Sequence, residues 1–246
     1  MQFRATASYD GTEFFGFQRQ GAFRSVQGEI ESALESITGE PPVVFGAGRT
    51  DSGVHATGQV IAFKVEWRHP PQALQRALNV NLPRDVVVRD VRECDGHFSP
   101  RFDALSRMYE YTVYRDLIRH PLRDRYAWQI GRMLDLAAMN EAAAELIGEH
   151  DFAAFGSPTS ESQSTIRKVL RAQWDEREGD MVFVIEANAF LYRMVRRIVN
   201  ALVKVGSGKI STTAFADALA SCDKNRITGL APAAGLCLTR VAYRDE

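Results

Sequence analysis

The sequence predicts an α+β protein made of two similarly ordered halves. Its 246 residues suffice for one large domain or two modest ones, and 45% apolar with 25% charged residues is ordinary for a globular protein. Short alternating apolar runs are interleaved with segments of helical periodicity. The same order of elements occurs twice along the chain, and period and order together carry the fold prediction.

The first half, residues 1–97, reads as strand, helix, strand, strand, helix and strand. A turn at Asp10-Gly11 ends the first strand, and Ser25 is a suitable N-cap for the first helix, which Gly39 stops. The double proline at 70–71 opens the second helix. The expected strands span residues 3–9, 43–48, 59–65 and 85–91.

The second half, residues 98–246, follows a similar order with an extra helix near its end. A hairpin is expected around Glu178-Gly179-Asp180. The expected strands span residues 108–114, 165–174, 181–187 and 235–243, and the expected helices span 135–147, 190–204 and 211–220. The order β-α-β-β-α-β is that of the ferredoxin-like unit, so we predict two such halves with a boundary near residues 93–100.

Composition excludes several classes of protein. The three cysteines are odd in number and widely spaced, which gives neither a disulfide framework nor a zinc spacing. The N-terminus runs directly into strand-like alternation without a signal peptide, and no apolar run approaches the ~18 residues that a membrane helix needs. We therefore expect a cytoplasmic protein that does not enter a membrane.

Positive charge is concentrated in two parts of a chain whose net charge is −1. Residues 101–132 contain seven arginines against four acids, and residues 186–209 contain five cations against one acid. Such clustering is a weak indication of nucleic-acid binding. A solvated charged face explains it equally well.

The stretch 48–58, GRTDSGVHATG, is the first candidate for a catalytic loop. It joins two apolar strands and carries Arg49, Asp51 and His55 among glycines, which allow tight backbone turns and close approach to a ligand. The alternative is an ordinary connection between strands, with Asp and Thr side chains bonded to their own backbone.

Helical periodicity singles out Arg196 in the segment 190–204. It shares a line of the helix with Tyr192, Val199 and Val203, so partial burial is expected. A buried guanidinium needs a carboxylate or phosphate partner, unless it snorkels past its apolar stem to water. Both interpretations stand at this point.

The strand 107–113 places Arg107, Tyr109, Tyr111 and Val113 on one face. Tyrosine beside arginine on a sheet face suits base stacking and phosphate contact. It equally suits an ordinary amphipathic sheet. No metal-ligand spacing is found among the five histidines, and residues 203–210 lack the Ser or Thr and the first glycine of a phosphate-binding loop.

Eight motifs in order resemble the tRNA pseudouridine synthase A (TruA) family over nearly the whole chain. They are YDGT with FQ at 9–18, VQG at 26–28, GRTD through QV at 48–60, NVNLP at 79–83, YEY at 109–111, HDF at 150–152, NAF through MVR at 188–196, and APAAGL at 231–236. Three positions depart from the family's common residues: Ser99, Asn200 and Cys237. They bear on RNA contacts, not on the reaction.

The resemblance implies two halves that share a central, mostly antiparallel sheet, with helices on one face and a cleft on the other. It also implies a homodimer, a tRNA substrate, no metal and no organic cofactor. The implied reaction converts uridine to pseudouridine at positions 38, 39 and 40 of the anticodon stem-loop.

By resemblance, Asp51 matches the nucleophile, Arg196 the basic residue paired with it, and Tyr109 the tyrosine that contacts the target base. Arg49 matches the arginine that holds the base flipped out, and Leu236 a residue that packs near the uracil. We count Arg107 and His55 among the substrate-binding candidates because they lie beside these residues in strand and loop.

The chemistry explains these residue types. A carboxylate is an adequate nucleophile and a good leaving group, and a nearby arginine keeps it ionised where burial opposes ionisation. The uracil must leave the base stack, which aromatic and arginine contacts offset. Two rival classes remain: a non-catalytic RNA-binding protein on duplicated ferredoxin-like sheets, and an aspartate-nucleophile hydrolase or phosphotransferase, for which no metal set or phosphate loop is found.

Overall fold

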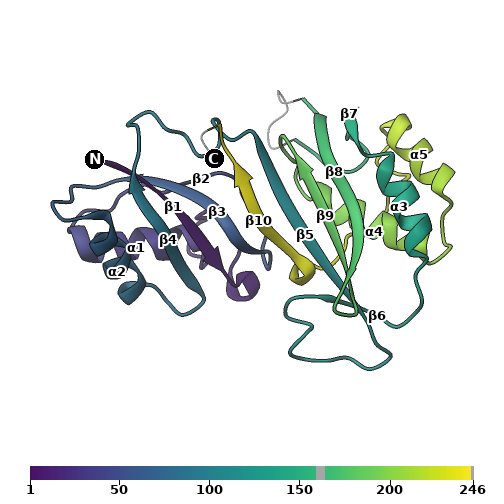
Figure 1. Cartoon of the computed structure of the whole chain (residues 1–246), viewed down its shortest axis with the longest axis horizontal. Coiled ribbons are helices and arrows are strands. Elements are labelled where there is room, and N and C mark those ends of the chain that lie inside the picture. Colours follow the sequence, from purple (N-terminus) through teal and green to yellow (C-terminus); the bar gives the residue numbers. More distant parts are fainter. Residues whose placement is uncertain (159–163, 245–246) are drawn as a thin grey trace. The chain divides into compact units, whose positions relative to one another are not determined.

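The computed structural model describes residues 1–158 and 164–244, which form ten strands and five α-helices in a mixed α/β arrangement. The chain divides into two compact units (Figure 1). Unit 1 is Met1–Leu105 together with the C-terminal segment from Cys237, and unit 2 is Ser106–Leu236.

Unit 1 builds its sheet around strand β1, which lies between β4 and β3 and is antiparallel to both. Strand β3 also pairs with β2, antiparallel, and with β10, parallel. Two helices, α1 and α2, contact each other, and α2 packs on β4. The elements are β1 (Gln2–Tyr9), α1 (Val26–Thr38), β2 (Phe45–Gly46), β3 (His55–Lys64), α2 (Pro71–Asn81), β4 (Val86–Glu93) and β10 (Leu236–Ala242).

Unit 2 has the strand order β5-β9-β8-β7, with β6 parallel to β5. Helix α3 contacts β8, α4 and α5, and a ring pair of Trp174 and Phe183 packs between β8 and β9. The elements are β5 (Ser106–Arg115), β6 (Trp128–Ile130), α3 (Leu136–Ala144), β7 (Gly148–Asp151), β8 (Ile166–Arg177), β9 (Asp180–Ala187), α4 (Met194–Gly206) and α5 (Thr212–Ser221).

Local sequence signals set several of these boundaries as predicted. The Ser25 hydroxyl accepts a hydrogen bond from the Gly28 N–H at the start of α1, and Gly39 takes the left-handed conformation at its end. The β8–β9 hairpin turns through Glu178 and Gly179, both with positive φ, as a two-residue hairpin turn requires.

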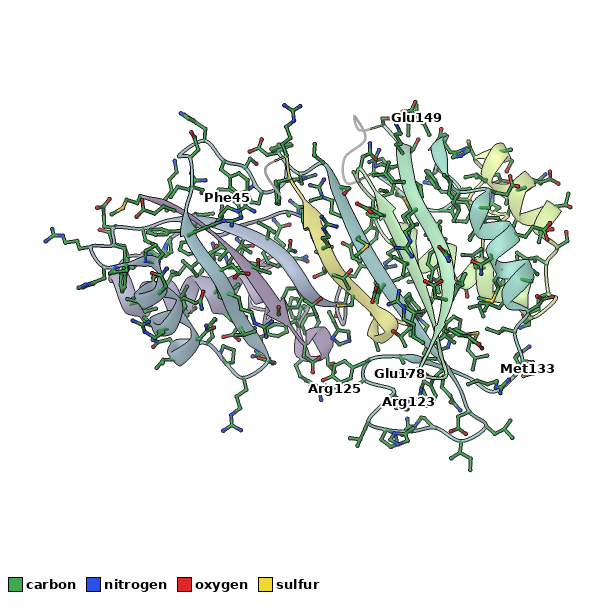
Figure 2. All side chains as sticks on the ribbon, in the orientation of Figure 1. Phe45, Arg123, Arg125, Met133, Glu149 and Glu178 are labelled. Atoms are coloured by element: carbon green, nitrogen blue, oxygen red, sulfur yellow. The ribbon has the colours of Figure 1, made fainter. Side chains whose placement is uncertain are left out.

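Strand β3 begins at His55, four residues earlier than predicted, because Gly58 continues the strand instead of ending the loop. A side-chain carbon at Gly58 would lie 2.1 Å from the Thr239 carbonyl oxygen, so this glycine lets strand β10 approach closely. The neighbouring strand at residues 43–48 shortens to Phe45–Gly46, and the Phe45 side chain is exposed (Figure 2).

Helix α4 begins at Met194, not at residue 190 as predicted. The Tyr192 N–H donates to the Ser157 carbonyl, and Arg193 has φ 61°, so residues 190–193 cannot be helical. From Met194 onward the helix buries an apolar stripe that includes Met194, Ile198 and Leu202. The short strands β6 and β7 carry too few residues for a period to be read, and the sequence did not predict them.

Candidate active site

The Asp51 loop of unit 1, residues 48–54, is clamped by three hydrogen bonds to the segment 14–17 and by a fourth to Tyr9. The Phe17 N–H donates to the Thr50 carbonyl at 3.2 Å, and the Gly53 N–H donates to the Phe14 carbonyl at 3.2 Å. The Ser52 hydroxyl donates to the same Phe14 carbonyl at 3.1 Å, and the Tyr9 hydroxyl bonds the Thr50 hydroxyl at 2.8 Å. The clamp holds the half-buried Asp51 on a fixed backbone.

Gly16 makes this clamp possible. Its φ is +94°, and a side-chain carbon there would lie 2.5 Å from the Thr50 carbonyl oxygen. Only glycine combines the left-handed backbone with so close an approach. The glycine that precedes Phe17 therefore has a direct physical reason in the geometry of the Asp51 loop.

His55 stands at the base of the same loop, buried at 5% exposure. Its Nδ1 accepts a hydrogen bond from the Gly11 N–H at 3.0 Å and lies 3.3 Å from Asp10 Oδ1. The imidazole thus ties the Asp10-Gly11 turn to the first residue of β3. Arg49 lies two residues before Asp51 in the same loop, and its side chain is exposed.

An exposed aromatic pair lies next to the clamp, and sequence reasoning passed over it. Phe15 and Phe23 stack with ring centroids 4.4 Å apart although they are 54% and 59% exposed. The Phe15 N–H donates to the Arg24 carbonyl, which joins the two sides of this turn. The only sign of this pair in the sequence is the cluster of phenylalanines at 14–17. That cluster does not show which rings are buried and which is exposed.

In unit 2, Arg196 is half-buried on the line of Val199 and Val203, as its periodicity predicted. Its Nε donates to the Ala231 carbonyl at 2.8 Å, and the Ala231 N–H donates to the Arg196 carbonyl at 3.2 Å. This two-point contact fixes the guanidinium against the segment 231–236.

Tyr111 holds the same segment from strand β5. Its hydroxyl donates to the Pro232 carbonyl at 2.8 Å, and burial raises the pKa of the phenol well above its ordinary value, while the positive charge of Arg196 opposes that rise. A side-chain carbon at Gly235 would lie 2.6 Å from the Tyr111 ring, so glycine is required where the segment crosses β5. The strand period correctly placed Tyr111 on one face with Tyr109, but it did not predict the hydrogen bond to Pro232.

Tyr109 and Arg107 share the buried face of β5, as their period of two predicted. Tyr109 meets the ring of Phe190 edge-on at 5.2 Å, and Arg107 Nη1 donates to the Asn188 carbonyl at 2.8 Å. Both contacts are to the segment that follows β9. Leu236 is buried at the start of β10.

The cationic stretch after β5 is partly neutralised inside unit 2. Arg123 pairs with Asp180 beside the β8–β9 turn of Glu178 and lies over the Tyr114 ring at 4.3 Å (Figure 2). Arg119 pairs with Asp124. These two arginines serve local structure, so the arginine count overstates the charge available for RNA.

The predicted site residues fall into two sets. Asp51, Arg49 and His55 belong to unit 1, and Arg107, Tyr109 and Arg196 with Leu236 belong to unit 2. Within residues 1–158 and 164–244, no group of three His, Cys, Asp or Glu side chains is arranged to hold a metal ion. No helix in those ranges has the length and apolar character needed to cross a bilayer.

Comparison with protein-family models defines the class. The model described as tRNA pseudouridine synthase matches residues 5–103 and 142–244. The chain therefore belongs to the tRNA pseudouridine synthase family, a family of isomerases.

Curated relatives named tRNA pseudouridine synthase A match along nearly the whole chain. The protein from Brevibacillus brevis is 43% identical, covering 98% of this chain and 98% of its own length. The protein from Methylacidiphilum infernorum is 42% identical, covering 99% and 96%, and that from Pseudothermotoga lettingae is 39% identical, covering 98% and 99%. A solved Cbf5-Nop10-Gar1 complex aligns at 14% identity over 80% of this chain and 54% of that chain, with a TM-score of 0.33, too low to support an argument.

Proposed function

We propose that this chain isomerises uridine to pseudouridine at positions 38, 39 and 40 in the anticodon stem-loop of tRNA. The observation that carries the proposal is the full-length similarity to relatives named tRNA pseudouridine synthase A, at 39 to 43% identity. The reaction breaks the N1–C1′ bond and joins C5 to C1′. The proton on C5 is lost to solvent and N1 regains one, so the mass of the RNA does not change.

Asp51 is the proposed nucleophile. The four hydrogen bonds of its loop hold the carboxylate on a backbone that does not have to reorganise during the reaction. Attack at C1′ of the sugar and attack at C6 of the base both use an ionised carboxylate that later leaves. The requirement for the loop is the same in either case.

Arg196 is the proposed source of the positive charge that keeps this carboxylate ionised in a site that excludes water. Its guanidinium suits the role because the hydrogen bond from Nε to the Ala231 carbonyl fixes its position. Tyr109 is proposed to stack on the target uracil, supported by its aromatic partner Phe190.

The remaining candidates are proposed to bind substrate. Arg49, exposed on the loop, would hold the extruded base, and Leu236 would pack near the uracil. Arg107 would support Tyr109 because both side chains contact the segment 188–190. His55 would support substrate binding by holding the turn at Gly11 in place.

Each half is proposed to be a ferredoxin-like unit, with the domains at residues 1–97 and 98–246 sharing one sheet. Support comes from the strand order β4-β1-β3, with β2 also on β3, and from the order β5-β9-β8 in the other unit. The resemblance to the family further suggests a homodimer that works in the cytoplasm without a cofactor.

The test is tritium release from tRNA labelled at C5 of uridine, measured for the wild type and for Asp51→Asn. The wild type is expected to release tritium at positions 38 to 40. The variant is expected to bind tRNA normally and release none. Turnover by the variant would remove Asp51 as nucleophile. Binding without any release by the wild type would indicate a non-catalytic RNA-binding protein instead.

A further inference from the structure

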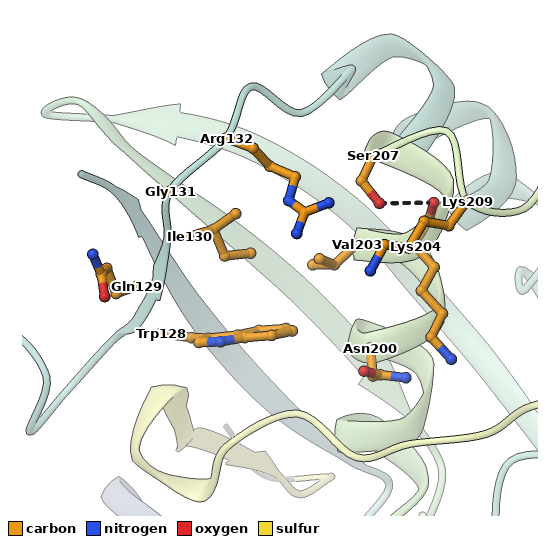
Figure 3. Close-up of a pocket in the computed structure, with 10 residues that line it drawn as sticks. All are labelled: Trp128, Gln129, Ile130, Gly131, Arg132, Asn200, Val203, Lys204, Ser207 and Lys209. Carbon is orange, nitrogen blue, oxygen red and sulfur yellow. Dashed lines mark hydrogen bonds between the residues drawn. The ribbon is translucent and has the colours of Figure 1, made fainter. Parts of the chain in front are cut away.

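A cavity of about 280 Å³ lies in unit 2, between the segment of strand β6 and the C-terminal half of helix α4 (Figure 3). It is separate from the Tyr111–Arg196 contacts, although Asn200 in its wall is one helical turn beyond Arg196. Its lining includes Trp128 and Arg132 from one side, and Asn200, Val203, Lys204 and Lys209 from α4 and the turn after it.

The lining carries three cations and no acid. Arg132 and Lys209 are exposed at the cavity, and Lys204 Nζ is held by the Thr228 carbonyl at 2.6 Å and the Thr228 hydroxyl at 3.1 Å. Three like charges around one cavity repel each other, and an anion inside it relieves that repulsion. The electrostatics therefore favour a phosphate group.

The same cavity also has the chemistry of a base-stacking surface. The half-buried Trp128 indole lies along the cavity (Figure 3). It is held edge-on against the Tyr111 ring, with the ring centroids 6.4 Å apart. Val203 adds an apolar contact. The Asn200 amide supplies a hydrogen-bonding group and is oriented by its bond to the Thr228 carbonyl. A flat aromatic ring beside cations binds a nucleotide without sequence preference.

We propose that this cavity binds one nucleotide of the RNA substrate, with its phosphate on Arg132, Lys209 and Lys204 and its base against Trp128. The proposal rests on the proposed tRNA-modifying function. Lys204 lies eight residues beyond Arg196 on the same helix, which places the cavity about 12 Å along α4 from that residue. A tRNA stem-loop can cover this distance, so the cavity would hold RNA outside the target uridine.

The test compares two double variants. The cavity variant combines Arg132→Gln and Lys209→Gln, and the control variant combines Arg68→Gln and Arg76→Gln. The control pair removes the same two charges from exposed positions of unit 1. We expect the cavity variant to bind tRNA about tenfold more weakly and to reduce the slope of log affinity against log salt by about 1, because one phosphate contact is lost. Equal effects of the two pairs would overturn the proposal.

Trp128→Leu tests the stacking wall. We expect weaker tRNA binding, by about tenfold, with an unchanged salt slope, since stacking releases no counterions. Trp128→Phe keeps an aromatic ring and should restore most of the affinity, which a purely structural role of the indole would not produce. If Trp128→Leu binds tRNA as the wild type does, the base assignment is wrong.

Titration with uridine monophosphate separates the two sources of a nucleotide. Binding of the free nucleotide that is lost in the cavity variant, with tRNA affinity unchanged, would overturn the assignment to RNA. Tritium release is measured in parallel. If the wild type released no tritium while the cavity variant still lost tRNA affinity, the proposed function would fail and the nucleotide site would stand.

Discussion

At the scale of single residues, Arg196 and Tyr111 hold adjacent carbonyl groups of one short segment. The first bonds Ala231 and the second bonds Pro232. The helical period predicted partial burial of Arg196, and the strand period placed Tyr111 on one face with Arg107 and Tyr109. They did not predict these contacts, because the partners are separated from Arg196 by 35 residues and from Tyr111 by 121, and belong to no regular element.

We expect Arg196→Met to abolish most tritium release and to lower stability. Removing the guanidinium leaves the carbonyl of the fully buried Ala231 without its Nε donor, which costs about 1–3 kcal/mol and lowers the melting temperature by several degrees. The measurements are thermal unfolding and single-turnover release at saturating tRNA.

Arg197→Met is the matched control, since it removes the same group one position along α4. It should raise the KM for tRNA and leave kcat and the melting temperature near those of the wild type. An Arg196→Met protein with normal kcat would show that this guanidinium takes no part in the reaction.

Tyr111 predicts a loss of stability at high pH. Burial holds its pKa above the ordinary value near 10, so the phenol stays neutral in the folded protein but ionises when the chain unfolds. Its contribution is complete below about pH 10 and is lost as the pH rises above that value. We expect the free energy of unfolding to fall more steeply above pH 10 in the wild type than in Tyr111→Phe.

Tyr192→Phe is the control for that measurement, because Tyr192 is about half exposed at 48%. Its pH dependence should follow that of the wild type. Should Tyr111→Phe also follow the wild type in denaturant titrations from pH 8 to 11.5, the phenol would not be the group responsible.

At the scale of elements, the clamp between the Asp51 loop and residues 14–17 explains what the sequence could and could not predict. The glycines and the acidic, basic and imidazole side chains marked the loop as functional. The hydrogen bonds that fix it come from Tyr9, Phe14 and Phe17, which lie far from the loop in sequence, at and after the end of the first strand. Long-range backbone bonds leave no period, so only the fold reveals them.

Gly16→Ala is expected to disrupt this clamp. The added methyl group would meet the Thr50 carbonyl at 2.5 Å in a backbone of φ +94°, so the loop has to shift, at a cost of roughly 1–3 kcal/mol. Tritium release should fall with stability, because the shift moves the Asp51 backbone.

Gly21→Ala is the matched control for Gly16→Ala. Gly21 also has a positive φ, +54°, but nothing lies within 4 Å of the added carbon. It should lose a fraction of the stability that Gly16→Ala loses and keep normal release. Equal losses by calorimetry and by tritium assay would mean that backbone strain, not the contact with the Asp51 loop, matters at both positions.

At the scale of the whole molecule, unit 1 is completed by the last strand of the chain. Reading the elements in order predicted the final strand at 235–243 and placed it in the second half. The structure pairs Cys237 and Leu238 of β10 with His55 and Ala56 of β3. A period of two cannot tell which strand will be a neighbour, so the pairing of β10 with β3 was not predicted.

Deleting residues from 237 onward is therefore expected to unfold unit 1, although the deleted segment lies far in sequence from the rest of that unit. Leu238, Val241 and Tyr243 are buried, and losing their burial costs about 1.5–3 kcal/mol each, a total comparable to the 5–15 kcal/mol that holds a domain together. Hydrogen exchange should show lost protection in β1 and β3. Tyr243→Phe, which removes the hydroxyl that bonds the Pro100 carbonyl and keeps the ring, should keep that protection. If the truncated chain kept protected amides in β1 and β3, strand β10 would be an accessory edge and residues 1–105 would form a self-sufficient domain.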